Sequence, residues 1–417
     1  MTHCAEIIAV GTEILLGGTV NTDARDVSLV LSEFGVNVLY HTVVGDNPER
    51  LKQAVDIAKR RVDIIITTGG LGPTYDDLTK QTLAEAFGKK LVFNEAVAAQ
   101  IRGYFKNRPH NMAMTENNLR QAELPEGCVI FDNGVGTAPG CAFEVEGIHV
   151  LMLPGPPREC RVMLESCVVP YLKKLSDSEI RSHNIHIFGL GESAVEAKLH
   201  DLMEGLLNPT LAPYAKEGEV MLRLTAKAGS KEETERLMAP VLEEVLKTLG
   251  DIVYGVDTGS LEETAVDLLE AGGLTFAAAE SCTGGLLSKR LTDVPGASKV
   301  FAGSIVAYSL RSKTALLGVN PYILNEKGAV CREVALAMAD GARGEFGADI
   351  GVGITGIAGP DGDGSGVEPG KVFIALTTES RAHCRELDLP NDRERVRIMG
   401  ASNALDMLRR HLTGLPV

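Results

Sequence analysis

Residues 279–285 read Ala-Glu-Ser-Cys-Thr-Gly-Gly and place a hydroxyl and a thiol directly before two glycines. The apolar run 274–279 predicts a buried strand, and residues 286–291 predict the first turns of a helix. Ser281 is therefore expected at a strand-to-helix junction, where free backbone N–H groups and the helix dipole stabilise an oxyanion or a phosphate. The pattern favours a serine nucleophile for acyl transfer, although an ordinary N-cap serine would give the same pattern.

A serine nucleophile needs a base, and Lys313 follows closely after the strand-like run 304–309. A lysine can replace the histidine of a serine hydrolase when it is desolvated enough to be neutral. Tyr308 would relay the proton or orient the pair. Taken singly, Tyr308 fits a half-buried strand residue and Lys313 a solvated one. Cys282 is an alternative nucleophile, less favoured than Ser281 because a thiol and a hydroxyl need different activation.

Four ordered segments, 280–285, 308–313, 353–360 and 392–397, resemble the carboxy-terminal domain of the CinA (competence/damage-inducible protein A) family. That domain is similar to stand-alone nicotinamide-nucleotide amidases. The resemblance implies hydrolysis of the carboxamide of nicotinamide mononucleotide to nicotinate mononucleotide and ammonia, without a cofactor. It implies Ser281 as the nucleophile, with Tyr308 and Lys313 as its activating partners.

The same resemblance implies a set of substrate-binding residues around the nucleophile. Donors near Thr283 and Gly284 would stabilise the oxyanion. Arg393 or Arg397 would bind the substrate phosphate with paired guanidinium N–H groups. These arginines begin a predicted helix, so a surface salt bridge is the alternative role. The chain departs from the family at residues 369–371, where Pro-Gly-Lys replaces Val-Gly-Thr. The implied substrate-binding residues are Glu280, Thr283, Gly284, Gly285, Thr355, Gly356, Gly359, Arg393 and Arg397.

The first part of the chain alternates strand and helix patterns. Residues 5–10, 36–44 and 62–68 read as strands, a helix fits 22–34, and Asn47-Pro48 opens the next helix. The continuous apolar run at 62–68 is typical of a parallel sheet that is covered on both faces. These patterns predict a doubly wound α/β domain that binds ligands at the carboxyl ends of its strands.

The loop 68–79, Thr-Gly-Gly-Leu-Gly-Pro-Thr-Tyr-Asp-Asp-Leu-Thr, follows the third of these strands. Its glycines let backbone N–H groups converge on a phosphate. Asp76 and Asp77 could hold a metal ion that bridges phosphate oxygens, or could simply place charge at a helix N-terminus. Asp46 ends another strand and is expected near the same site. The loop is neither a Walker A sequence nor a Rossmann fingerprint.

Six segments of this part resemble the amino-terminal CinA domain, which is related to molybdopterin-binding domains. They are 11–13, 44–46, 68–79, 118–122, 136–140 and 154–159. The resemblance implies a metal-dependent ADP-ribose pyrophosphatase, with a pterin ligand as the alternative, and a divalent metal ion held by Asp46 and Asp77. The implied phosphate or nucleotide site comprises Gly69, Gly70, Gly72, Thr74, Asp76, Asp77, Gly11 and Glu13.

Three domains are expected. Residues 1–172 would form the molybdopterin-binding-like domain, 173–255 a small KH-like α+β module, and 256–417 the α/β amidase domain. The middle module has no basic G-x-x-G clamp of the kind used on RNA, which favours a spacer or dimerisation role.

The 417 residues carry a formal net charge of −15, which argues against a nucleic-acid-binding surface. The eight cysteines include no C-x-x-C pair, which favours reduced thiols and a cytoplasmic protein. No signal peptide and no membrane-spanning run are expected. The expected partners are small nucleotide substrates and a second copy of the chain as a homodimer. A non-enzymatic scaffold, or a protein with one active domain, stays open as an alternative.

Overall fold

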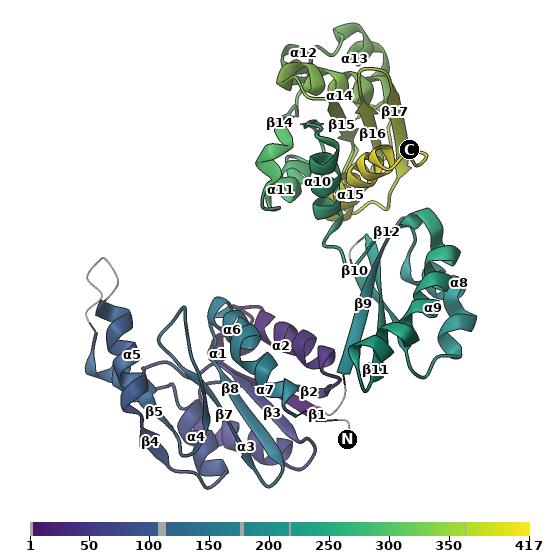
Figure 1. Cartoon of the computed structure of the whole chain (residues 1–417). Helices are drawn as coiled ribbons and strands as arrows, with labels where there is room; N and C mark the ends of the chain where they lie inside the picture. The colour runs from purple at the N-terminus through teal and green to yellow at the C-terminus, as the bar shows by residue number, and fades with distance from the viewer. Residues whose placement is uncertain (1–2, 107–113, 176–178, 217, 363) are drawn as a thin grey trace. The chain divides into compact units, whose positions relative to one another are not determined.

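The computed structural model describes residues 3–106, 114–175, 179–216, 218–362 and 364–417 (Figure 1). The chain forms two compact units: residues 1–181 with 227–235, and residues 182–226 with 236–417. In the described part of the chain, no helix is long and apolar enough to cross a bilayer.

The first unit contains a mixed six-stranded sheet and a two-stranded ribbon. Its strands are β1 (Cys4–Val10), β2 (Asn37–Val44), β3 (Ile64–Thr68), β4 (Leu91–Phe93), β5 (Glu123–Pro125), β6 (Val129–Phe131), β7 (Gly140–Val145) and β8 (Ile148–Leu153). Its helices are α1 (Thr12–Leu15), α2 (Thr22–Glu33), α3 (Pro48–Ala58), α4 (Thr79–Ala86), α5 (Glu95–Lys106), η1 (Glu116–Ala122), α6 (Pro157–Met163), η2 (Leu164–Val168) and α7 (Val169–Lys173).

The large sheet has the strand order β2-β1-β3-β8-β7-β6. The strands from β2 to β8 pair in parallel, whereas β8, β7 and β6 pair antiparallel. Alternate residues of β3 enter different cores: Ile65 packs beneath α3, α4 and α5, and Ile64 and Ile66 pack beneath α2 and α6. The predicted α/β sheet with helices on both faces is therefore confirmed, but the half formed by β8, β7 and β6 is antiparallel.

Local sequence explains the helix starts of this unit. Asn21 Oδ1 accepts the Ala24 N–H of α2, and Asn47 Oδ1 accepts the Arg50 N–H of α3, with Pro48 at the first helical position. Such caps satisfy N–H groups that have no partner within the helix.

A four-stranded module follows, with strand order β10-β11-β9-β12, in which β10 pairs antiparallel with β11 and β12 antiparallel with β9. It comprises β9 (Glu179–Phe188), α8 (Glu192–Glu204), β10 (Thr210–Lys216), β11 (Glu219–Ala228), α9 (Lys231–Leu249), η3 (Gly250–Ile252) and β12 (Val253–Val256). Sequence reasoning missed the edge strand β10, because Pro213 within it argues against a strand and is tolerated only at an edge.

The last part of the chain is a five-stranded sheet with the order β14-β13-β15-β16-β17. Its strands are β13 (Phe276–Glu280), β14 (Phe301–Val306), β15 (Ile350–Gly356), β16 (Lys371–Thr377) and β17 (Ala382–Asp388). Its helices are α10 (Leu261–Gly272), α11 (Leu286–Thr292), η4 (Ala297–Lys299), α12 (Leu310–Leu317), α13 (Pro321–Lys327), α14 (Arg332–Phe346) and α15 (Arg393–Leu412).

Strand β13 lies inside this sheet, with β14 and β15 parallel to it on either side. Ala278 faces the core under α10, α11 and α15, whereas Ala277 and Ala279 face the core under α12 and α14. The carboxyl end of β13 therefore projects from a rigid, doubly covered support, and Ser281 is the next residue.

Candidate functional sites

The loop between β13 and α11 holds Ser281 by its backbone. The Ser281 N–H donates to the Ile354 carbonyl of β15 at 3.0 Å, which extends the strand pairing by one residue. Gly284 and Gly285 then adopt left-handed φ angles of 61° and 93°. Residues with a side chain rarely adopt such angles, so this sharp turn needs the two glycines. The predicted strand-to-helix junction is confirmed.

Lys313 reaches Ser281 from the first half of α12. Its Nζ donates to Ser281 Oγ at 2.8 Å and to the Ala307 carbonyl at 2.6 Å. Lys313 is 1% exposed and Ser281 8% exposed. Burial lowers the pKa of Lys313 to about 8, with a weaker opposing effect from Cys282. A neutral amine is therefore accessible near physiological pH and can take the Ser281 proton.

Tyr308 is not joined to this pair. Its side chain is 66% exposed, and in the described residues no hydrogen bond connects it to Ser281 or Lys313. The structure thus brings together two of the three predicted catalytic side chains.

The alternative nucleophile Cys282 lies in an unfavourable environment. Burial raises the pKa of its thiol to about 11, against the opposing effect of the backbone N–H groups of Cys282 and Thr283. A thiol is nucleophilic as the thiolate, so this shift disfavours Cys282 as a nucleophile.

Glu280 occupies the helix N-terminus that the sequence interpretation had assigned to an oxyanion or a phosphate. Its fully buried carboxylate accepts the N–H groups of Gly285 (3.0 Å), Leu287 (3.1 Å) and Ser288 (2.9 Å), and the Ser288 hydroxyl (2.5 Å). That interpretation was wrong for these donors, because a side chain of the protein already satisfies them. Glu280 positions the nucleophile loop.

The predicted oxyanion donors need a second correction. The Gly284 N–H donates to the Ser281 carbonyl at 3.1 Å and is not free. Within the described residues, the N–H groups of Cys282 and Thr283 have no carbonyl acceptor. These two donors directly follow the nucleophile and face the Cys282 sulfur, which is a weak acceptor. An oxyanion would be the stronger acceptor for them.

The two predicted phosphate-binding arginines contact backbone carbonyls. Arg397 donates to the Thr283 carbonyl through Nη2 at 3.0 Å, and Arg393 donates to the Gly359 carbonyl through Nη1 at 2.9 Å. They tie α15 to the nucleophile loop and to the loop after β15, and their phosphate role stays a prediction.

Two further predicted residues lie at the carboxyl end of β15. Glu280 is opposite Ile354 in the sheet, so Thr355 and Gly356 come next to the nucleophile loop. The Thr355 hydroxyl donates to the Ala329 carbonyl at 2.8 Å.

A Glu280→Gln variant is expected to lose about 1–3 kcal/mol of unfolding free energy. In wild type both carboxylate oxygens accept hydrogen bonds from the nucleophile loop and α11, whereas the amide of the variant has a single acceptor oxygen. Urea denaturation measures the loss. Glu270→Gln is the matched control, since Glu270 pairs with Lys299 on the surface, where water and salt screen an ion pair and it contributes little to stability. Equal losses in the two variants would contradict the positioning role.

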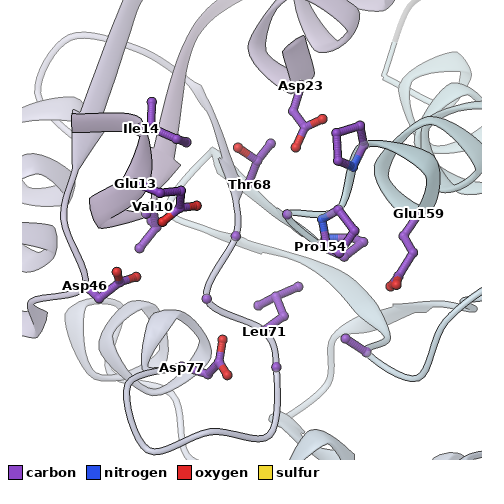
Figure 2. A pocket seen from close by; sticks show the side chains of 18 of the residues that line it. Val10, Glu13, Ile14, Asp23, Asp46, Thr68, Leu71, Asp77, Pro154 and Glu159 are labelled. Atoms are coloured by element: carbon purple, nitrogen blue, oxygen red, sulfur yellow. The ribbon is translucent and has the colours of Figure 1, made fainter. Parts of the chain in front are cut away.

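The first unit contains a separate cavity of about 630 Å³ at the carboxyl ends of β1, β2 and β3 (Figure 2). Every residue that the sequence assigned to a nucleotide or metal site lines it. These are Gly11, Glu13, Asp46, Gly69, Gly70, Gly72, Thr74, Asp76 and Asp77.

The glycine loop is pressed against β1. A Cβ on Gly69 would lie 2.2 Å from the Val10 carbonyl oxygen, and one on Gly70 would lie 2.1 Å from Thr79 Oγ1. In the described part of the chain, the N–H groups of Gly70, Leu71 and Gly72 have no protein acceptor. A row of free donors in a cavity wall is suited to phosphate oxygens.

The two predicted metal ligands use one oxygen each within the protein. Asp46 Oδ2 accepts the Thr12 N–H and hydroxyl at 2.9 and 2.8 Å, and Asp77 Oδ2 accepts those of Thr74 at 2.9 and 2.5 Å. Neither Oδ1 has a partner among the described residues. Over the same residues, no group of three or more His, Cys, Asp or Glu side chains could hold a metal. Carboxylate oxygens are the donors that Mg²⁺ takes when its other ligands come from phosphate and water, and the metal site at Asp46 and Asp77 stays a prediction.

Asp76 belongs to the same turn as Asp77. Its Oδ1 shares the single proton of the Thr74 hydroxyl with Asp77 Oδ2, and this contact lowers the pKa of the Asp76 carboxyl. Asp76 therefore helps to fix the turn that carries Asp77.

The fold and the sites together define a multidomain α/β protein. One domain contains a buried Ser–Lys pair, and another contains a cavity lined by the free N–H groups of a glycine loop. Models of three families match consecutive parts of the chain: "Probable molybdopterin binding domain" at residues 6–174, "Damage-inducible protein CinA KH domain" at 182–255, and "CinA C-terminal domain" at 258–412.

Full-length relatives agree with these matches. The chain is 48% identical over 410 residues to a CinA-like protein of Dictyoglomus thermophilum, covering 98% of this chain and 99% of the relative. It is 47% identical over 411 residues to a CinA-like protein of Kosmotoga olearia, covering 99% of each. The chain belongs to the CinA family.

Among solved structures, a competence/damage inducible protein from Agrobacterium tumefaciens is 35% identical and matches 37% of this chain and 97% of its own, with a TM-score of 0.36.

Proposed function

We propose that the carboxy-terminal domain hydrolyses the carboxamide of nicotinamide mononucleotide to nicotinate mononucleotide and ammonia, as a step in pyridine-nucleotide recycling. The observation that supports this most is the 2.8 Å hydrogen bond between Lys313 Nζ and Ser281 Oγ inside the fold. A nucleophile and a base at this distance, beside backbone donors, are the elements of acyl transfer.

In the proposed reaction, neutral Lys313 takes the Ser281 proton while Ser281 Oγ attacks the carboxamide carbon. The N–H groups of Cys282 and Thr283 stabilise the resulting oxyanion. Lys313 then gives the proton to the departing ammonia as the C–N bond breaks. Water next attacks the acyl-serine ester, and Lys313 takes and returns a proton in the same way, which releases nicotinate mononucleotide and free Ser281.

The direct test is ammonia release from nicotinamide mononucleotide by the purified full-length chain. Turnover supports the proposal. If the folded chain releases no ammonia from this substrate, the proposed amidase function is refuted.

We further propose that the cavity of the first domain hydrolyses the phosphoanhydride of ADP-ribose to AMP and ribose 5-phosphate. The free N–H groups of Gly70, Leu71 and Gly72 support it as a phosphate site. Asp46 and Asp77 would hold a divalent cation, which when bound neutralises phosphate charge.

Asp77→Asn tests this second proposal. The amide oxygen can still accept from Thr74, so the loop is preserved, but the negative charge is lost. We expect metal-dependent hydrolysis of ADP-ribose to fall by about 100-fold, the usual size for one group that stabilises a transition state. Ammonia release by the same variant is the internal control and is expected to be unchanged. Full ADP-ribose hydrolysis in the variant would remove Asp77 from the site.

A further inference from the structure

The cavity of the first domain also contains a buried carboxyl group that the proposed phosphate and metal sites do not use. Asp23 is the second residue of α2, and Figure 2 shows it reaching from that helix into the cavity. Its side chain has no hydrogen bond among the described residues, and Oδ1 is fully buried. The residue is 7% exposed.

No neighbouring group of the described residues explains why the Asp23 carboxyl group is buried. Asn21, and not Asp23, caps α2. The nearby cations Arg25 and Arg161 both pair with Asp26, at 2.7 and 3.0 Å. Burial raises the pKa of Asp23 to about 6, with Asp26 adding to the rise and Arg161 opposing it. A buried carboxyl group without a partner costs stability, so a structural role does not explain it.

A second buried acceptor lines the same cavity. Gln121, near the end of η1, is 1% exposed; its Nε2 donates to the Leu71 carbonyl at 3.5 Å, and its Oε1 has no partner among the described residues. The Nζ of buried Lys80 donates to the Gln121 carbonyl at 2.8 Å and holds this segment in place. Both acceptors thus belong to fixed elements.

The chemistry of the missing partner follows from these acceptors. Two residues of the lining have side-chain acceptors without a protein donor, and the cavity lining within the described residues includes no aromatic side chain on which a base could stack. Hydroxyl groups of a sugar supply donors without requiring a stacking surface. We propose that Asp23 and Gln121 accept hydrogen bonds from the ring hydroxyls of a sugar phosphate whose phosphate lies on the glycine loop. This inference rests on the proposed phosphate-ligand function of the same cavity.

Binding to the full-length chain, measured by calorimetry, tests the proposal with two probes. Ribose 5-phosphate has ring hydroxyls, whereas tetrahydrofurfuryl phosphate has a similar ring and the same phosphate group but no ring hydroxyl. We expect wild type to prefer ribose 5-phosphate by at least about tenfold, because the second probe leaves both acceptors unpaired. We expect Asp23→Ala to lose most of this preference and Gln121→Met to lose part of it.

Glu33→Gln is the matched control, because Glu33 is an exposed carboxyl group on the same helix; it is expected to keep the preference. Thermal unfolding of each variant, followed by circular dichroism, checks that the first domain is folded. Asp23→Asn, nearly isosteric, is a second variant whose preference should not change with pH. In wild type the preference should rise as pH increases through about 6, because an ionised carboxylate is the stronger acceptor. Taking the ratio of the two affinities cancels the ionisation of the phosphate.

Equal affinity for the two probes, no binding of either probe by wild type, or an unchanged preference in Asp23→Ala would each overturn the inference. Selective binding by a chain that does not hydrolyse ADP-ribose would uphold the hydroxyl-binding site while refuting the proposed pyrophosphatase. Hydrolysis of ADP-ribose by a chain that binds the two probes equally would uphold the proposed pyrophosphatase and refute the hydroxyl-binding site.

Discussion

The Ser281→Ala variant is expected to release ammonia from nicotinamide mononucleotide at least about 10³-fold more slowly than wild type, because it lacks the hydroxyl that forms the acyl intermediate. The fold should be unaffected, since the Ser281 backbone N–H, and not its hydroxyl, bonds to β15. The measurement is the steady-state rate of ammonia release, with unfolding followed on the same samples.

Cys282→Ala is the control for the neighbouring residue. Its thiol is protonated at neutral pH because burial raises the pKa to about 11, so the variant should keep ammonia release within about threefold of wild type. The opposite pattern, with Ser281→Ala active and Cys282→Ala inactive, would assign the nucleophile to the thiol. Near-normal rates in both variants would rule out the covalent scheme.

Much of this site can be predicted from the sequence because local patterns determine it. The apolar run before Ser281 and the two glycines after it specify a strand, a sharp turn and a helix, and the structure has all three. The same holds for the glycine loop of the first domain, where the residues picked from the sequence line one cavity.

The errors arise where the burial or the partner of a charged side chain depends on how the chain folds around it. The free N–H groups of α11 were assigned to substrate, but Glu280, the residue directly before Ser281, accepts them. An acidic residue at the end of a strand gives no sign that it will turn back over the next helix. Asp23 was missed for a related reason: in sequence it looks like ordinary negative charge in the first turn of a helix, and only the tertiary structure shows its burial.

Separate locations of the two sites permit clean tests. The Ser–Lys pair and the glycine-loop cavity belong to different compact units. A substitution at one site is therefore not expected to change the chemistry at the other, so each activity can serve as the internal control for the amount of active chain in the assay of the other.

Replacing Lys313 by methionine is expected to reduce ammonia release by about 10³-fold, because the unbranched thioether fills similar space but cannot take a proton. Wild-type activity should rise with pH and level off above about 8, since only neutral Lys313 is a base and burial lowers its pKa to that value. Lys299→Met is the control for removing a lysine, because Lys299 lies on the surface paired with Glu270 and should have no effect on turnover. A Lys313→Met variant with wild-type activity would exclude Lys313 as the base.

Stability gives an independent measure of the same pKa. Between about pH 8 and 10 the unfolded chain still holds the Lys313 proton that the folded chain has lost, so the unfolded state binds more protons and the free energy of unfolding rises with pH. The wild-type minus Lys313→Met difference in unfolding free energy isolates this effect from other titrating groups. We expect that difference to rise across this window. A difference that stays flat with pH would mean that Lys313 keeps its ordinary pKa and is charged at physiological pH, which would contradict its role as the base for Ser281.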